Sequence, residues 1–155
     1  MRDRARSGED TLRRVTFLLV LLPLLVAFPY VRALNNPNEM VRVFTVMALV
    51  ENGTYVIDEQ VAIFGWSEDM ARVRGEDGAE HQVMVKAPGI VYAGVPAYAL
   101  YSKVVAPLLG RRYPGPAATA GPEEAATREA RLSWLRASTW AMRLVASQLP
   151  CFFFL

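Results

Sequence analysis

The sequence places an amide and a carboxylate side by side at Asn38 and Glu39, directly after the turn signal Asn35-Asn36-Pro37. A carboxylate within hydrogen-bond reach of a hydroxyl or an amine can take or orient its proton, which an attacking nucleophile needs. Asn38 cannot accept a proton in this way, because its side chain is an amide. A structural role is equally open, since Asn38 can cap a helix and the helix dipole favours Glu39 in the first turn.

Three further charged residues could bind a substrate. Asp58, followed by Glu59, offers a second carboxylate or belongs to a solvated loop. Lys86 and Arg42 are cations that could hold a phosphate group, which lysine does as a compact point charge. The structural alternative is that both side chains lie along apolar surface and keep their charged ends in water.

The sequence lacks the residues for common metal and disulfide sites. It contains one histidine and one cysteine, Cys151, so a zinc site of the usual type and an intramolecular disulfide are both excluded. The net charge is +2, and the arginines cluster beside apolar runs rather than along a basic face interleaved with aromatics. This pattern does not predict binding to nucleic acid.

Apolar runs must position these residues, because 53% of the chain is hydrophobic. The run from Val15 to Val31 has no charged residue and lies between Arg14 and Arg32, which predicts a transmembrane helix at 15–33. The alternative for this run is a secretory signal peptide cleaved at Val31-Arg32-Ala33. A second run predicts a transmembrane helix at 87–110, and a third, at 137–155, ends with the chain and predicts a truncated span.

Arginine placement orients the predicted spans. Basic residues are dense in segments 1–14 and 111–136, so both segments are expected in the cytoplasm and 34–86 is expected to be an extracytoplasmic loop. Apolar residues recur at helical spacing from Met40 and stop at Asn52-Gly53, which predicts an interfacial helix at 39–52. The expected fold is an all-α, multi-pass protein of the inner or plasma membrane, and the N-terminal part of a longer chain.

Three segments carry a likeness to a known family: NPNEMVRVFTVMALVENGTYVID at 36–58, VKAPGIVYAGVPAYAL at 85–100, and the trailing RLVASQLPCFFFL. They resemble the opening of the polytopic, C-superfamily membrane glycosyltransferases, in the protein mannosyltransferase-like and aminoarabinose transferase-like branches. The likeness touches most of the chain and contains no strict signature.

The resemblance implies transfer of a sugar from a polyprenyl-phosphate carrier to an extracytoplasmic acceptor, with membrane lipid and the lipid-linked donor as partners. It makes Glu39 and Asn38 the catalytic candidates, acting on the acceptor nucleophile directly or through a divalent metal ion. The family position usually reads Asp-Glu, so Asn38 is a departure. Lys86, Arg42 and Asp58 are the substrate-binding candidates. Such a site needs many helices, so this fragment alone is expected to be inactive.

Two other classes of function remain open on the sequence. One is a membrane-anchored interaction subunit without catalysis, whose loop docks a partner. The other is an exported small domain that is released when a signal peptide is cleaved.

Overall fold

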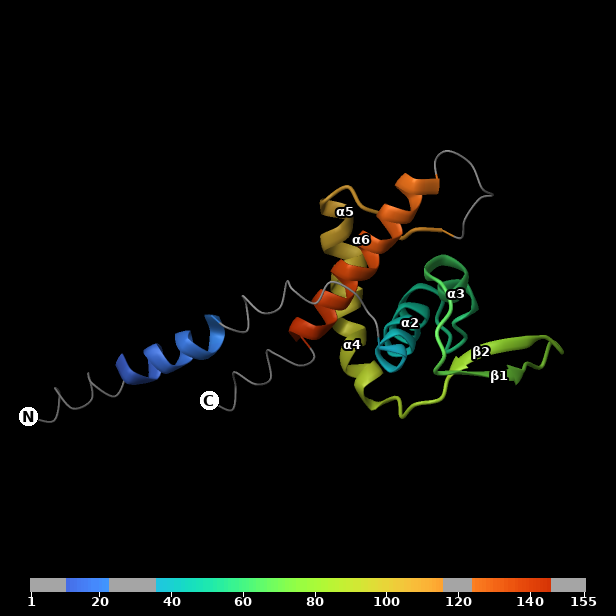
Figure 1. Ribbon diagram of the computed structural model, residues 1–155, viewed down its shortest axis with the longest axis horizontal. Coiled ribbons are helices and arrows are strands. Elements are labelled where there is room, and N and C mark those ends of the chain that lie inside the picture. The colour runs from blue at the N-terminus through green and yellow to red at the C-terminus, as the bar shows by residue number, and fades with distance from the viewer. Residues whose placement is uncertain (1–10, 23–35, 116–123, 146–155) are drawn as a thin grey trace, which may run out of the picture.

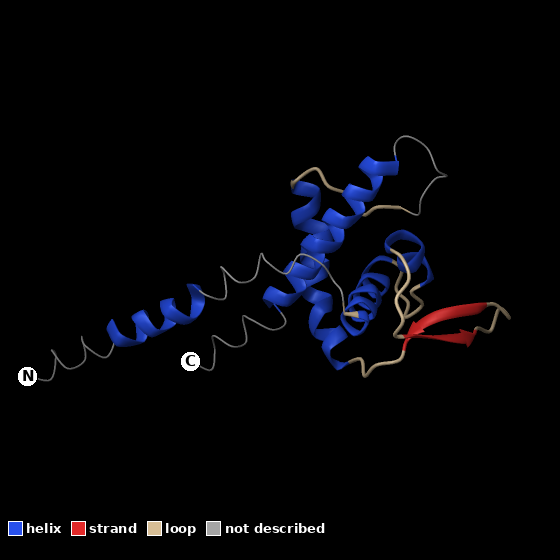
Figure 2. Cartoon of the chain, in the orientation of Figure 1, coloured by secondary structure: helices blue, strands red, loops and turns tan. Residues whose placement is uncertain are grey.

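The computed structural model describes residues 11–22, 36–115 and 124–145. Within these ranges the chain is mostly helical, with a helix at 11–22, helices α2 to α6 and one two-stranded antiparallel sheet. Figure 1 shows α2 between α4 on one side and α3 with the sheet on the other, and α6 packed across α4. Figure 2 shows the two strands projecting as a hairpin from the helices. The prediction of an all-α fold was therefore wrong.

Helix α2 (Pro37–Glu51) begins where the sequence can satisfy the free N–H groups of a first helical turn. The N-cap is Asn36, whose side-chain oxygen accepts a hydrogen bond from the Asn38 backbone N–H at 3.0 Å. Pro37 follows at the first helical position, where the N–H that proline lacks would have no helical partner. The prediction that Asn38 caps the helix was wrong by two positions.

Helix α2 is buried on nearly all sides rather than along one stripe. Every residue from Val43 to Ala48 is buried, and Val41 and Phe44 are completely inaccessible to solvent. The one polar residue in this stretch, Thr45, donates its hydroxyl hydrogen to the Val41 carbonyl at 2.7 Å. A helix that is apolar all round belongs in a core. The prediction of an interfacial helix at 39–52 placed a helix here correctly but placed it in the wrong environment.

The segment that follows α2 contributes to the core instead of forming a loop. Asn52-Gly53 ends α2, with Gly53 at φ 69°, and α3 (Asp58–Phe64) packs back on it. Strands β1 (Met70–Arg74) and β2 (Glu80–Met84) then pair antiparallel, in the register Met70 opposite Met84 to Arg74 opposite Glu80. The predicted extracytoplasmic loop at 34–86 is thus two helices and a hairpin.

The apolar run at 87–110 forms three consecutive helical pieces. These are α4 (Gly89–Leu100), a π-helical turn η2 (Tyr101–Val105) and α5 (Ala106–Leu108). Within η2 the Ala106 N–H donates to the Tyr101 carbonyl, five residues back. Pro107 follows directly, and it has no N–H to offer the Lys103 carbonyl.

Helix α6 (Glu124–Arg143) packs across α4 and η2 and touches α3. Its buried residues Trp134, Leu135 and Met142 join one core cluster with side chains of α2 and α4. Two buried serine and threonine residues lie between them, Ser138 and Thr139. Thr139 donates its hydroxyl hydrogen to the Leu135 carbonyl at 2.7 Å.

None of the helices in the described part of the chain is both long enough and apolar enough to cross a membrane. The prediction of a multi-pass, all-α membrane protein was therefore wrong, and so was that of a transmembrane helix at 87–110. More than half of each of the other two predicted spans, at 15–33 and 137–155, lies outside the described residues. The physical reason is clearest in α4, whose apolar side chains pack on α2 and α6. Residues 23–33, including the alternative cleavage site, and residues 146–155 lie outside the described ranges.

Candidate functional site

A pocket of about 260 Å³ lies where α2, α4 and α6 converge, and we call it the three-helix pocket. Charged residues from α2 and α6 line one part of it: Glu39, Arg42 and Arg143. Apolar side chains from the three helices line most of the rest, together with Asn36, Gly94 and Thr139: Val43, Val46, Ile90, Val91 and Met142. The pocket therefore combines a charged end with an apolar chamber, as binding sites for small molecules do.

Glu39 is paired with Arg143 across the three-helix pocket. The Arg143 Nε donates to Glu39 Oε1 at 2.6 Å, and Nη2 donates to Oε2, so the two groups form a bidentate pair. The two side chains keep 26% and 30% of their surface exposed, which leaves the pair partly open to solvent screening. Both carboxylate oxygens are engaged by a cation. Glu39 is therefore held as a structural ion pair rather than presented as a base.

Arg42 is the second cation of the three-helix pocket, and it has no such partner. Its Nε is out of reach of water and donates no hydrogen bond within the part of the chain that the structure describes. Arg42 lines the pocket one helical turn from Glu39, which faces the same space. One carboxylate thus faces two guanidinium groups, and the pocket carries net positive charge.

The other predicted site residues lie away from this pocket. Asn38 is in the first turn of α2 and does not line it, and the Lys86 Nζ pairs with Asp69 Oδ1 at 3.2 Å near the hairpin. Asp58 starts α3, where its Oδ1 accepts from the Gln82 backbone N–H at 2.7 Å and ties α3 to β2. The structure brings Glu39 and Arg42 together and separates Asn38, Lys86 and Asp58 from them. Sequence reasoning missed Arg143.

The divalent metal ion that the resemblance implies does not fit at Glu39. Both Glu39 oxygens already accept hydrogen bonds from Arg143, and a second guanidinium, Arg42, lines the same pocket. Among the described residues no cluster of three His, Cys, Asp or Glu side chains is arranged to hold a metal ion. A site of net positive charge favours an anion over a cation.

His81 lies between two carboxylates beside the turn of the hairpin. Its Nδ1 is 2.7 Å from Asp58 Oδ2 and its Nε2 is 3.0 Å from Asp77 Oδ2. The hydrogen bond to Asp58, then the one to Asp77, raises the pKa of His81 above its ordinary 6.5. The backbone N–H of Ala79, then His81, lowers the pKa of Asp77. The cluster therefore favours a protonated imidazole, which links α3 to the hairpin.

The hairpin cluster predicts a pH-dependent contribution to stability. Because folding raises the pKa of His81, its protonated form stabilises the fold fully below about pH 6.5, and this contribution is lost as the pH rises through the higher folded value. We expect the difference in stability between the wild type and His81→Gln to shrink over that window in urea titrations. The His81 Cε1 proton should titrate in NMR with a midpoint above 6.5, and Asp77→Asn should lower that midpoint. A wild-type midpoint at or below 6.5 would contradict the cluster.

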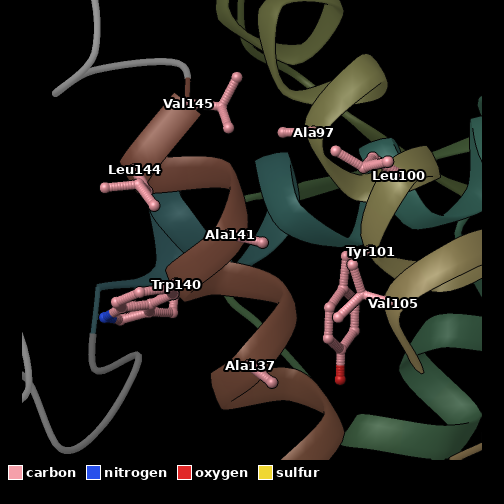
Figure 3. Close-up of a pocket in the computed structure, with 9 residues that line it drawn as sticks. All are labelled: Ala97, Leu100, Tyr101, Val105, Ala137, Trp140, Ala141, Leu144 and Val145. Carbon is pink, nitrogen blue, oxygen red and sulfur yellow. The ribbon is translucent and has the colours of Figure 1, made fainter. Parts of the chain in front are cut away.

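A second concave site runs between α4–η2 and α6, and we call it the α4–α6 groove. It has a volume of about 470 Å³ and is lined almost entirely by carbon atoms. Figure 3 shows small side chains along its floor, Ala97, Ala137 and Ala141, with larger ones on both walls. Trp140 stands on the α6 wall, and Leu100, Tyr101 and Val105 form the opposite wall.

A buried polar network holds the two walls of this groove in place. The Glu51 carboxylate, only 11% exposed, accepts from the Tyr98 hydroxyl at 3.0 Å and also pairs with Lys103. Burial, then the Glu51 charge, raises the pKa of Tyr98, so this hydroxyl stays protonated and donates. The Trp134 Nε1 of α6 donates to the same Tyr98 hydroxyl at 3.3 Å. The network thus joins α2, α4 and α6.

No protein-family model matches the sequence, and neither a curated protein nor a solved structure matches the chain.

Proposed function

We propose that the protein is a non-catalytic interaction subunit that self-associates by binding an apolar helix in its α4–α6 groove. The observation that carries this proposal is the lining of the groove, which is almost entirely carbon over a volume of about 470 Å³. A docked apolar helix would cover these walls and remove their surface from water.

The proposed occupant is the helix at 11–22 of a second copy. This helix exposes large apolar side chains, including Leu18 at 58% and Leu19 at 67% (the blue helix in Figure 1). An isolated helix shorter than about 12–15 residues is marginal in water, so it needs a surface to pack on. The groove is such a surface, because Leu100 and Trp140 beside it are also exposed, at 56% and 43%. Apolar helices in apolar grooves are a common recognition mode.

Reciprocal exchange explains why the partner would be a second copy. Each chain carries one helix and one groove, so a pair related by a two-fold axis buries both helices in equivalent contacts. The gain in free energy of association is about 25 cal/mol for each Å² of apolar surface removed from water. This is the usual logic by which an exposed apolar face marks an association site.

Sugar transfer from a polyprenyl-phosphate carrier stays a prediction of the sequence resemblance. The geometry supports an interaction role better, because the proposed acceptor-side acid, Glu39, is paired through both oxygens with Arg143. The substrate-binding candidates Lys86 and Asp58 are likewise engaged, by Asp69 and by His81.

The test uses two single variants that introduce a charge at opposite sides of the same contact. Ala141→Arg places a charge on the groove floor, and Leu18→Arg places one on the docking helix. We expect sedimentation of the full chain to show a dimer for the wild type. Each variant should weaken association by roughly a hundredfold or more, because an unpaired buried charge costs several kcal/mol.

Mixing the two variants tests the exchange directly. Ala141→Arg retains a normal helix and Leu18→Arg retains a normal groove, so an equimolar mixture should associate although neither variant does alone. Leu132→Arg is the matched control, since Leu132 is exposed on α6, the helix that carries Ala141, and does not line the groove. It should leave the dimer intact. A wild-type monomer at all concentrations, or a dimer that neither Ala141→Arg nor Leu18→Arg weakens, would refute the proposal.

A further inference from the structure

The Arg42 side chain in the three-helix pocket carries a buried donor without a partner. Its Nε is shielded from water and has no hydrogen-bond partner among the described residues, which is also true of the Arg131 Nε elsewhere on α6. Leaving a charged donor buried without an acceptor is costly, which is why such groups are normally paired. The other guanidinium of the pocket, Arg143, is satisfied by Glu39. The contrast within one pocket points to an acceptor that the protein itself does not supply.

The other residues of the three-helix pocket indicate what kind of ligand could supply that acceptor. Apolar side chains of α2 and α4, Val43, Val46 and Ile90, form the wall beside Arg42. Gly94 of α4 lines the same wall, and a Cβ there would come within 3.1 Å of Val46 Cγ2 and 3.4 Å of Met142 Sδ. The glycine therefore lets α4 approach Val46 and Met142 closely, and a larger residue would have to displace these lining side chains.

We propose that the three-helix pocket binds a small amphiphilic carboxylate, with its anionic head on Arg42 and its short apolar tail against α2 and α4. A planar guanidinium matches a carboxylate in geometry and charge. The cavity of about 260 Å³ corresponds to several water molecules of about 30 Å³ each, which is room for a ligand of about eight non-hydrogen atoms. Hexanoate has that size. This site is separate from the α4–α6 groove and does not depend on self-association.

Binding of hexanoate to the full chain tests both parts of the proposal. Calorimetry should show saturable binding of hexanoate, with hexanol, which keeps the tail and loses the charge, weaker by roughly tenfold or more. Inorganic phosphate, which has charge and no tail, should also bind at least about tenfold more weakly, because the tail buries apolar surface. In NMR the methyl signals of Val43, Val46 and Ile90 should shift with hexanoate.

Two variants locate the site. Arg42→Gln keeps a polar side chain of similar reach and removes the charge, so hexanoate affinity should fall by roughly 10- to 100-fold. Arg136→Gln removes an exposed arginine of α6 that does not line the pocket, and it should change nothing. Equal affinity for hexanoate and hexanol in the wild type, or full affinity in a folded Arg42→Gln variant, would overturn the proposal. So would phosphate binding as tightly as hexanoate, because the tail would then play no part.

Discussion

Replacing Trp134 by alanine is expected to detach α6 from the rest of the protein and to abolish both candidate sites together. Trp134 is 2% exposed and its ring makes edge contacts with Tyr101 at 5.2 Å and with Tyr113 at 5.8 Å between centroids. Truncating a buried tryptophan to alanine costs about 3–5 kcal/mol, and each aromatic pair adds about 0.5–1.5 kcal/mol beyond the area that it buries. This loss is a large fraction of the typical stability of a domain, about 5–15 kcal/mol.

Detachment of α6 would affect both candidate sites, because this helix lines each of them. It provides Arg143 to the three-helix pocket, and Trp140 and Ala141 to the lining of the α4–α6 groove. Hydrogen exchange should show faster exchange of α6 amides in Trp134→Ala, with loss of both self-association and hexanoate binding. Trp66→Ala is the matched control, because Trp66 is 56% exposed and lies outside α6. Its stability should change by no more than about 1 kcal/mol. Unchanged α6 protection in Trp134→Ala would show that other contacts hold this helix.

Local chemistry in the sequence predicted the ends of α2 well. The turn around Pro37 and the Asn52-Gly53 pair bracket the helix, because capping and positive φ depend on a few adjacent residues. The environment of the helix was not predictable in the same way. An apolar helix packs equally well against lipid or against other apolar helices, and composition does not distinguish the two. The run at 87–110 shows this, since Val91 and Tyr98 within it are completely buried by protein.

The hairpin escaped prediction because its strands carry few apolar residues. Arg72 and Arg74 on β1 face Gln82 and Glu80 on β2, so the period-two alternation that identifies a strand is weak. Pairing depends instead on the turn, where Gly78 adopts φ 78° and the Gly75 N–H donates to the Ala79 carbonyl at 2.8 Å. Glycines at both ends of a polar stretch are also typical of loops, which is what the sequence predicted.

Only part of the three-helix pocket could be predicted from the sequence, because some of its residues lie far apart in the chain. Glu39 was a candidate as a carboxylate that could act on a nucleophile and Arg42 as a cation that could hold a phosphate, and both line the three-helix pocket. Arg143 is 104 positions from Glu39, so no local pattern connects the two. The signal that could have found it is its isolation, as a single charge in the apolar run at 137–155. A charge in such a run requires a partner, and the sequence offers acidic candidates only at a distance.

Because α2 is buried in the core, the substitution Phe44→Ala is expected to have the other large effect on stability. If α2 were interfacial, Phe44 would lie against lipid or solvent, and its loss would change stability little. In the structure it is completely buried in the centre of α2 and stacks on Phe64 of α3, with ring centroids 5.8 Å apart. Removing the ring leaves a cavity where α2, α3 and the core meet, and we expect a loss of about 3–5 kcal/mol. Urea denaturation should show the midpoint falling with an unchanged slope.

Val73→Ala, at a half-exposed position on the hairpin, is the control and should shift stability by no more than about 0.5 kcal/mol. Similar small shifts for both variants would place α2 back at a surface, and the three-helix pocket, which α2 builds from one side, would lose its basis.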